Sequence, residues 1–232
     1  MEIAIDLHIH SALSPCAEDD MTPNNIVNMA LLKRLDAISI TDHNGCDNIE
    51  AVIKAADDRI IVVPGIEVQT REEVHLLCYF NEVDKLLDFE DIIKDKLPNI
   101  KNDPKVIGNQ LIIDEKDEIV GERQYMLISS IDMSLDQVLD EVQKREGAVV
   151  PAHIDRSSYS IISQLGFIPE NLGIGMLEIS QNNNKHFMDL PNDRMLFSSD
   201  AHYLWQILER ESFLTVDHLS ISQIVNTLKH SR

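Results

Sequence analysis

Potential metal ligands follow short apolar runs at several places along this chain of 232 residues. An apolar run that ends in such residues is typical of a buried strand whose last residues reach a ligand site. A packed core has no need of imidazoles and carboxylates at these points, because each of them requires a polar partner. The pattern therefore predicts strand ends that meet around a multinuclear metal site. The fragments are Asp6-Leu7-His8-Ile9-His10, Thr41-Asp42-His43-Asn44, Pro151-Ala152-His153 and Ser199-Asp200-Ala201-His202, with Glu67 and His75 as single residues between them.

Strand and helix signals alternate along most of the chain. Strands are expected at residues 3–7, 37–41, 60–68 (broken or bent at Pro64-Gly65), 74–80, 148–151, 175–179, 195–198 and 213–216. Helices are expected from Pro23 to about Arg34, from a capping box at 47–50, from a second box at Ser134 to Gly147, and from Ser220 onward. Strands that alternate with helices imply parallel βαβ connections, and about seven such units favour a closed barrel over an open sheet.

The segment from about residue 98 to 130 departs from this alternation. Within it, the stretch from Leu111 to Gly121 has the pattern of a β-hairpin with a charged turn. We expect a single domain over residues 1–232, with this segment inserted beside the loops that bind ligands. An insertion that serves only solubility is the alternative.

The chain is strongly acidic, with a formal net charge of −20 from 40 acidic and 20 basic residues. Binding to long nucleic acids requires a basic surface that replaces counterions, so we expect no duplex nucleic acid as a partner. A small anionic ligand remains compatible, because divalent metal ions would offset the repulsion. No apolar stretch approaches the roughly 20 residues that span a bilayer, so we expect no membrane partner.

The cysteines and the N-terminus predict a cytoplasmic location. Cys16, Cys46 and Cys78 have no paired spacing, which indicates a reducing compartment. The first residues, from Met1 to Asp6, form a strand-like run without a basic region, which is unlike a signal peptide.

Spacing within the fragments indicates which side chains share a face. His8 and His10 are two residues apart on a strand, so both point to the same side. Asp6 has the same parity and is expected to accept a hydrogen bond from an imidazole. Asp200 and His202 repeat this spacing after a later strand. Two histidines on one buried face are difficult to satisfy in a core, which favours metal ligation.

The remaining candidates lie singly at or within other predicted strands. His43 follows the second strand and His153 follows the strand at 148–151. Glu67 ends the third strand, and its carboxylate is able to bridge two metal ions, which an imidazole cannot do. His75 alone would be interpreted as a hydrogen-bonded core histidine, but in this company a ligand role is favoured.

The ordered set of motifs resembles that of the polymerase and histidinol phosphatase (PHP) superfamily. The resemblance extends from Asp6 to His202; each motif alone is weak, whereas the set is specific. It implies a distorted (β/α)7 barrel of the TIM type, a site for two or three divalent ions (zinc, manganese or iron), and hydrolysis of a phosphate ester.

By position, the resemblance implies three ion sites. The first would take His8, His10, Glu67 and Asp200, the second Glu67 as bridge with His75 and His153, and the third His43, His202 and a ligand from the loop after His10. Many relatives supply Asp or His in that loop, whereas this chain has Ser14-Pro15-Cys16. Cys16 is therefore a candidate thiolate ligand, which would favour zinc or iron, and a thiol that touches no metal is the alternative.

The sequence predicts a metal-dependent phosphoesterase. Glu67 as the metal bridge and His202 as an aid to the leaving oxygen are the predicted catalytic residues, and Arg156 is the candidate for binding phosphate oxygens. An ion pair of Arg156 with Asp155 or another acid is the alternative. The expected substrate is a small anionic phosphorylated molecule, with a nucleotide or an oligonucleotide end as further candidates.

Two other functions remain open from the sequence. One is an amidohydrolase-type barrel, which also begins with a His-x-His strand but hydrolyses C–N bonds and often bridges its metals through a modified lysine. The other is a metal-binding regulatory module without turnover.

Overall fold

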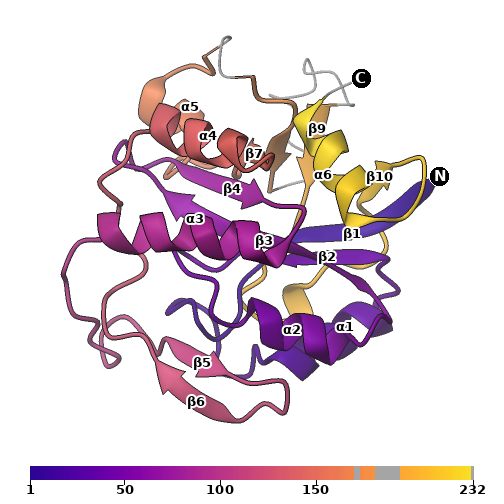
Figure 1. The fold of residues 1–232 in the computed structure, drawn as a ribbon, viewed down its shortest axis with the longest axis horizontal. Helices are drawn as coiled ribbons and strands as arrows, with labels where there is room; N and C mark the ends of the chain where they lie inside the picture. Colours follow the sequence, from indigo (N-terminus) through magenta and orange to yellow (C-terminus); the bar gives the residue numbers. More distant parts are fainter. Residues whose placement is uncertain (170–172, 181–193, 231–232) are drawn as a thin grey trace.

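The computed structural model describes residues 1–169, 173–180 and 194–230, and a six-stranded mixed sheet lies at its centre (Figure 1). The strands, in the order of the sheet, are β10 (Phe213–Thr215), β1 (Glu2–Ile9), β2 (Ala37–Ile40), β3 (Ile61–Gln69), β4 (His75–Tyr79) and β7 (Ala148–Pro151). β1, β2 and β3 run parallel, whereas β4 is antiparallel to both of its neighbours and β10 is antiparallel to β1.

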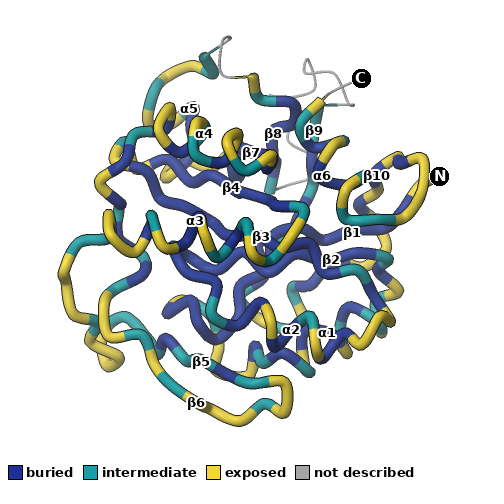
Figure 2. The backbone as a smooth tube through the Cα atoms, in the orientation of Figure 1, coloured by how far each residue is buried: buried dark blue, intermediate teal, exposed yellow. Residues whose placement is uncertain are grey.

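Helices bury both faces of this sheet. They are α1 (Pro23–Leu32), α2 (Ile49–Ala56), α3 (Val83–Lys96), α4 (Leu135–Lys144), α5 (Ile161–Leu165) and α6 (Ile221–Lys229), with a short 3-10 turn at Leu204–Gln206. Alternate residues of β1 enter two different hydrophobic clusters: Ala4 belongs to the one that includes α1 to α4, and Ile3 and Ile5 to the one that includes α6. Figure 2 shows β1 to β4 and β7 buried along nearly their whole length, as is typical of a sheet covered on both faces. Within the described residues, no helix is long and apolar enough to cross a membrane.

The predicted (β/α)7 barrel is not confirmed. β8 (Leu177–Ile179) and β9 (Met195–Phe197) form a separate parallel pair. A few backbone hydrogen bonds beside these strands link them to the main sheet: from Ile154 N to Glu178 O (2.9 Å), from Ala201 N to His8 O (3.2 Å) and from His10 N to Ala201 O (2.9 Å). The sheet therefore curls into a half-barrel, and no continuous ladder closes it among the described residues. The mixed direction follows from β3 and β4, which a short turn joins without a crossover helix.

The segment that was expected to be inserted contains the predicted hairpin. β5 (Leu111–Ile113) and β6 (Ile119–Glu122) pair antiparallel, and Figure 1 shows them beside α2, at the opposite side of the molecule from α4 and α5. The side-chain oxygen of Asn48 accepts a hydrogen bond from Ile113 N (2.8 Å). Arg123 donates from Nε to Asp47 (2.7 Å) and from Nη2 to Glu90 of α3 (2.5 Å). These bonds fasten the hairpin to the body of the domain.

Two local predictions differ from the structure. Asp47 does not cap α2, since the N-cap is Asn48 without a side-chain cap bond, and the Asp47 carboxylate pairs with Arg123 instead. β3 runs through Pro64-Gly65 without a break. A Cβ at Gly65 would lie 2.3 Å from Ser39 Oγ, so glycine is needed there for the close approach of β2 and β3. The capping box at Ser134 is present as predicted.

We expect Arg123→Met to lower the free energy of unfolding by about 2 kcal/mol, because it leaves the buried carboxylate of Glu90 with Lys94 as its remaining ion-pair partner. Arg71→Met is the matched control: its ion pair with Asp132 is exposed, and its loss should cost less than about 0.5 kcal/mol. Urea denaturation of both variants measures the difference. Equal losses would show that the Arg123 contacts contribute no more than a surface pair.

Candidate metal centre

Strand ends deliver the predicted ligands to one place. His8 and His10 leave β1 on the same side and are fully buried, with their Nε2 atoms 3.2 Å apart. Glu67 lies on β3 and His75 begins β4, while His43 follows β2 and forms an isolated bridge with Glu67. Three more ligand candidates follow β7 and β9, namely His153, Asp200 and His202, and Cys16 lies in the loop after β1.

Left-handed backbone turns aim two of these residues. His153 has φ 32° and Asp200 has φ 52°, in a region that non-glycine residues seldom occupy. His153 lies two residues after the end of β7, and Asp200 lies three residues after the end of β9. Strain of this kind persists only where the surroundings impose it, and it concentrates at functional sites.

The buried carboxylate of Glu67 is the centre of the cluster. Its Oε1 lies 2.8 Å from His75 Nδ1 and 3.5 Å from both His8 Nε2 and His153 Nε2. Its Oε2 lies 2.9 Å from His43 Nδ1 and 3.3 Å from His10 Nε2. Five imidazoles, carried by four strands or the segments that follow them, therefore converge on one carboxylate.

Asp200 forms the second acidic point of the site. Its Oδ1 lies 3.1 Å from His8 Nε2 and 3.0 Å from His10 Nε2. Its Oδ2 accepts a hydrogen bond from Arg156 Nη1 at 2.5 Å. Arg156 thus pairs with another acid, which is the alternative that the sequence left open, and it lies within the candidate site.

A third group gathers on the outer side of His10. Nitrogen atoms of His10, His43 and His202 lie close enough together to hold one ion. Cys16 Sγ is 3.1 Å from His202 Nε2, and the thiol is exposed and forms no disulfide. The structure therefore brings all nine predicted ligands and Arg156 together; their function as ligands stays a prediction.

The outer nitrogens of four histidines have hydrogen-bond acceptors, which fixes the direction of the inner nitrogens. His8 Nδ1 lies 3.0 Å from Glu178 Oε1, and His10 Nδ1 lies 2.9 Å from Ser14 Oγ. His75 Nε2 lies 3.4 Å from Gln69 Oε1, and His202 Nδ1 lies 2.8 Å from the backbone carbonyl of Asp200. A ring that donates from its outer N–H presents an unprotonated inner nitrogen, which is the form that binds a metal.

Glu178 is a residue that sequence reasoning missed. Its carboxylate accepts from His8 Nδ1 and from the backbone N–H of His153 (2.8 Å), so it orients two ligands at once. The signal was its place at the end of β8, but the motif set was complete without it. Asp6, which was expected to accept from an imidazole, accepts from the backbone N–H groups of Ser199 (3.1 Å) and Leu208 (3.0 Å).

Several inward-facing atoms fit a bound cation. Both carboxylate oxygens of Glu67 and Nδ1 of His43 are buried. Among the described residues they have close neighbours but no partner at an angle that forms a hydrogen bond. Buried polar atoms are rarely left in this condition. Lone pairs that converge on a common point without hydrogen bonds are what divalent ions require, so these residues fit a multinuclear metal centre.

Charges within the site shift the pKa values strongly. Burial works against ionised Glu67, but the neighbouring His75 and His43 outweigh it and hold the pKa of Glu67 well below its usual value. Burial likewise opposes charge on His10 and His43. The contacts of His10 with Asp200 and of His43 with Glu67 nevertheless raise the pKa of each ring to about 9.

His202 behaves in the opposite way. Burial and the nearby charge of His10 lower the pKa of His202 to about 3. The ring is therefore neutral at pH 7, which suits a metal ligand and disfavours donation of a proton by His202 in the ion-free state.

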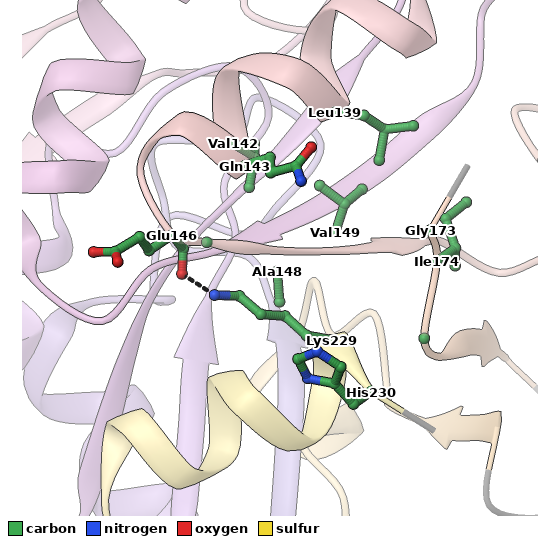
Figure 3. A pocket seen from close by; sticks show the side chains of 12 residues that line it. Leu139, Val142, Gln143, Glu146, Ala148, Val149, Gly173, Ile174, Lys229 and His230 are labelled. Carbon is green, nitrogen blue, oxygen red and sulfur yellow. Dashed lines mark hydrogen bonds between the residues drawn. The ribbon is translucent and has the colours of Figure 1, made fainter. Parts of the chain in front are cut away.

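The site opens into a small pocket of about 100 Å³. Its lining consists of His43, Glu67, His75, His153, Arg156, Ser158, Tyr159, Asp200 and His202. A larger cavity of about 650 Å³ lies elsewhere (Figure 3). Ala148 and Val149 at the start of β7 line that cavity, and Lys229 closes part of it by donating to the Glu146 carbonyl. Because His153 follows the other end of β7, the two pockets belong to opposite ends of this strand.

We expect metal affinity to rise with pH between roughly pH 6 and pH 8. The pKa values near 9 mean that His10 and His43 each carry a proton in the ion-free site, and an incoming cation must displace it. Each displaced proton should change the apparent affinity about tenfold per pH unit. Zinc titration calorimetry in buffers of different ionisation enthalpy counts these protons, and release of none would contradict the expectation.

Comparison with known proteins identifies relatives of this arrangement. An uncharacterized protein of Methanocaldococcus jannaschii is 32% identical over 90 residues, which cover 39% of this chain and 11% of that protein. The lesion-specific endonuclease Q of Pyrococcus furiosus is 19% identical with a TM-score of 0.66, over 99% of this chain and 56% of that one. A proposed metal-dependent phosphoesterase from Bifidobacterium adolescentis is 16% identical with a TM-score of 0.55, over 98% of this chain and 96% of that one. This chain thus spans little more than half of the endonuclease.

The expectation that excluded duplex nucleic acid is wrong. Endonuclease Q, which shares this fold, has been solved with a 27-mer duplex that carries an abasic lesion at the active site, and this chain matches that structure with a TM-score of 0.67. Net charge describes the whole surface, whereas a nucleic acid contacts only a local part of it. The total of −20 therefore gave no basis for the exclusion.

The model of the PHP domain matches residues 6–146, more than half of the chain, and includes the elements that carry His8, His10, His43, Glu67 and His75. The chain therefore belongs to the PHP domain family.

Proposed function

We propose that this chain hydrolyses phosphate esters with two or three divalent ions held at the Glu67 cluster. The observation that carries the proposal is a buried carboxylate, without hydrogen bonds of its own, that faces five imidazoles. An anion in that position needs cations beside it, and several ions on one carboxylate suit the transfer of a dianionic phosphoryl group.

The proposed ion sites share Glu67. The first would use His8, His10, Glu67 and Asp200, the second Glu67, His75 and His153, and the third His43, His202 and Cys16. The contacts of Asp200 with His8 and His10, and of His202 with Cys16, support the first and third sets. The contact between Glu67 and His75 supports the second.

The chain's own residues set the conditions of the reaction. When bound, the ions would supply the Lewis acidity that makes water reactive at neutral pH and offsets charge on phosphoryl oxygens. Glu67 stays ionised because its pKa is held low, so it keeps its charge at every working pH. Glu178 holds His8 and the backbone of His153 in place, which keeps the first two sets in register.

Arg156 is proposed to bind the phosphoryl group. It is the one lysine or arginine among the residues that line the pocket, and one of its nitrogens is engaged with Asp200. The rest of the guanidinium has donors left for phosphate oxygens, which Arg binds in a bidentate manner. The substrate class is a phosphate mono- or diester of a small molecule, a nucleotide or an oligonucleotide end, and DNA belongs in the test panel beside metabolites because of endonuclease Q.

We expect Glu67→Gln to reduce turnover of an aryl phosphate by a factor on the order of 10³ or more, since a neutral amide cannot balance neighbouring cations. The measurement is nitrophenolate release with zinc or manganese added, on protein whose metal content has been determined. His218→Ala is the control, because this exposed histidine lies outside the cluster.

Full activity of metal-analysed Glu67→Gln would refute the assignment. Metal binding by the wild-type protein without turnover on any phosphoester would favour the regulatory module, and hydrolysis of C–N bonds alone would favour the amidohydrolase alternative.

We expect Cys16→Ser to weaken zinc binding at the third set by about tenfold or more, because a soft thiolate ligand is replaced by a hydroxyl. Cys16→Asp should restore an ion there and shift the preference toward manganese, which favours carboxylate oxygen. Metal content after dialysis against mixed zinc and manganese, measured by mass spectrometry, tests both variants. Identical metal content and selectivity in all three proteins would remove Cys16 from the site.

A further inference from the structure

The loop between β7 and α5, residues 153–160, is firmly held at the mouth of the pocket. Asp155 accepts a hydrogen bond from Ser180 N (2.9 Å), and Ser160 Oγ donates to the Arg156 carbonyl (2.7 Å). Ser160 also caps α5. The loop therefore has an ordered shape of its own, and four of its side chains line the pocket: the ligand candidate His153, Arg156, Ser158 and Tyr159.

Tyr159 is held in an unusual position within this loop. Its backbone has φ 57°, in the left-handed region, and its carbonyl accepts a hydrogen bond from His75 N (2.8 Å). Its ring stacks on the ring of His75, with centroids 4.8 Å apart and planes inclined by 17°. One face of the phenol ring is thereby covered, yet 43% of the residue remains exposed.

The size of the pocket determines where the rest of a substrate must lie. A volume of about 100 Å³ accommodates ions and a phosphoryl group, whereas pockets that enclose a whole organic ligand have roughly 300–1,000 Å³. The group esterified to the phosphate must therefore extend past the rim. Apart from the ligand candidates, Tyr159 is the residue with an aromatic ring among those that line the pocket, and it belongs to the same loop as Arg156.

We propose that Tyr159 is a specificity-determining residue that stacks on a planar ring carried by the phosphate ester, a nucleobase or a simple aryl group. The inference rests on the proposed function, since it assumes a phosphoryl group in the pocket. A ring fixed by stacking on His75 loses little conformational freedom when a second ring packs on it. Stacking of this kind accepts any planar partner, so it selects a class of substrate and not one compound.

Binding of nonhydrolysable analogues tests the proposal without requiring turnover. The ligands are the methylenephosphonate analogues of adenosine monophosphate and of methyl ribofuranoside phosphate, which differ by the base, together with benzylphosphonate and ethylphosphonate. Calorimetry on zinc-loaded protein gives the ratio of dissociation constants within each pair. Because both members of a pair use the same ions, this ratio is independent of a partial loss of metal.

The wild-type protein should bind the ring-bearing member of at least one pair about tenfold more tightly. Tyr159→Leu and Tyr159→Asn should bring this ratio close to one, and asparagine tolerates the left-handed backbone. Tyr159→Phe should retain the preference. Tyr125→Leu, which changes a similarly exposed tyrosine in the segment 98–130, is the matched control and should retain it as well.

A preference in the adenosine pair assigns a nucleobase, and one in the benzyl pair alone assigns a simple aryl ester. Equal binding within both pairs, absence of binding, or a preference that survives Tyr159→Leu would overturn the inference. The proposed function fails separately: a Tyr159-dependent preference without hydrolysis of any ester refutes turnover alone, and hydrolysis without a ring preference refutes only the role of Tyr159.

Discussion

Burial of the Glu67 carboxylate is the constraint on which the rest of this structure depends. A buried anion is tolerated only beside positive charge, and here that charge comes from imidazoles on β1, β2, β4 and β7 or the segments that follow them. The strands can converge in this way because hydrophobic clusters fix both faces of the sheet. A polar centre built from so many separate segments therefore requires a rigid apolar frame around it.

The mixed direction of the sheet serves the same centre. The antiparallel register of β3 and β4 places Gln69 opposite His75 and Glu67 opposite Leu77. Residues opposite each other, and those two positions further along, share a face of the sheet, so Glu67 and His75 become diagonal neighbours. A parallel β4 after a crossover helix would begin at the other end of β3, and His75 would then enter at the far end from Glu67. The departure from an alternating βα barrel is therefore what joins these two residues.

Sequence reasoning located the residues of the cluster better than it located their surroundings. His8, His10 and Asp200 could be found because a period of two and a position at a strand end leave a visible pattern. The direction of β4 could not, since the short turn at residues 70–74 resembles any other connection in a list of elements. The role of Glu178 and the partner of Arg156 were not predicted, because no local sequence pattern encodes a contact between distant residues. Glu178 is 170 positions from His8, and Asp200 is 44 positions from Arg156.

The acidity of the chain and its proposed anionic substrate are reconciled at the pocket itself. A surplus of carboxylates raises the local concentration of cations and repels phosphate. Without bound ions, Oδ2 of Asp200 pairs with Arg156, and its Oδ1 lies beside His8 and His10. The raised pKa values of these two rings mean that their protons offset the negative charge of the carboxylates. Divalent ions that replace those protons carry more charge in the same volume, so the pocket becomes positive only when it is loaded. Under the proposed function, binding of phosphate in this pocket would then depend on bound metal.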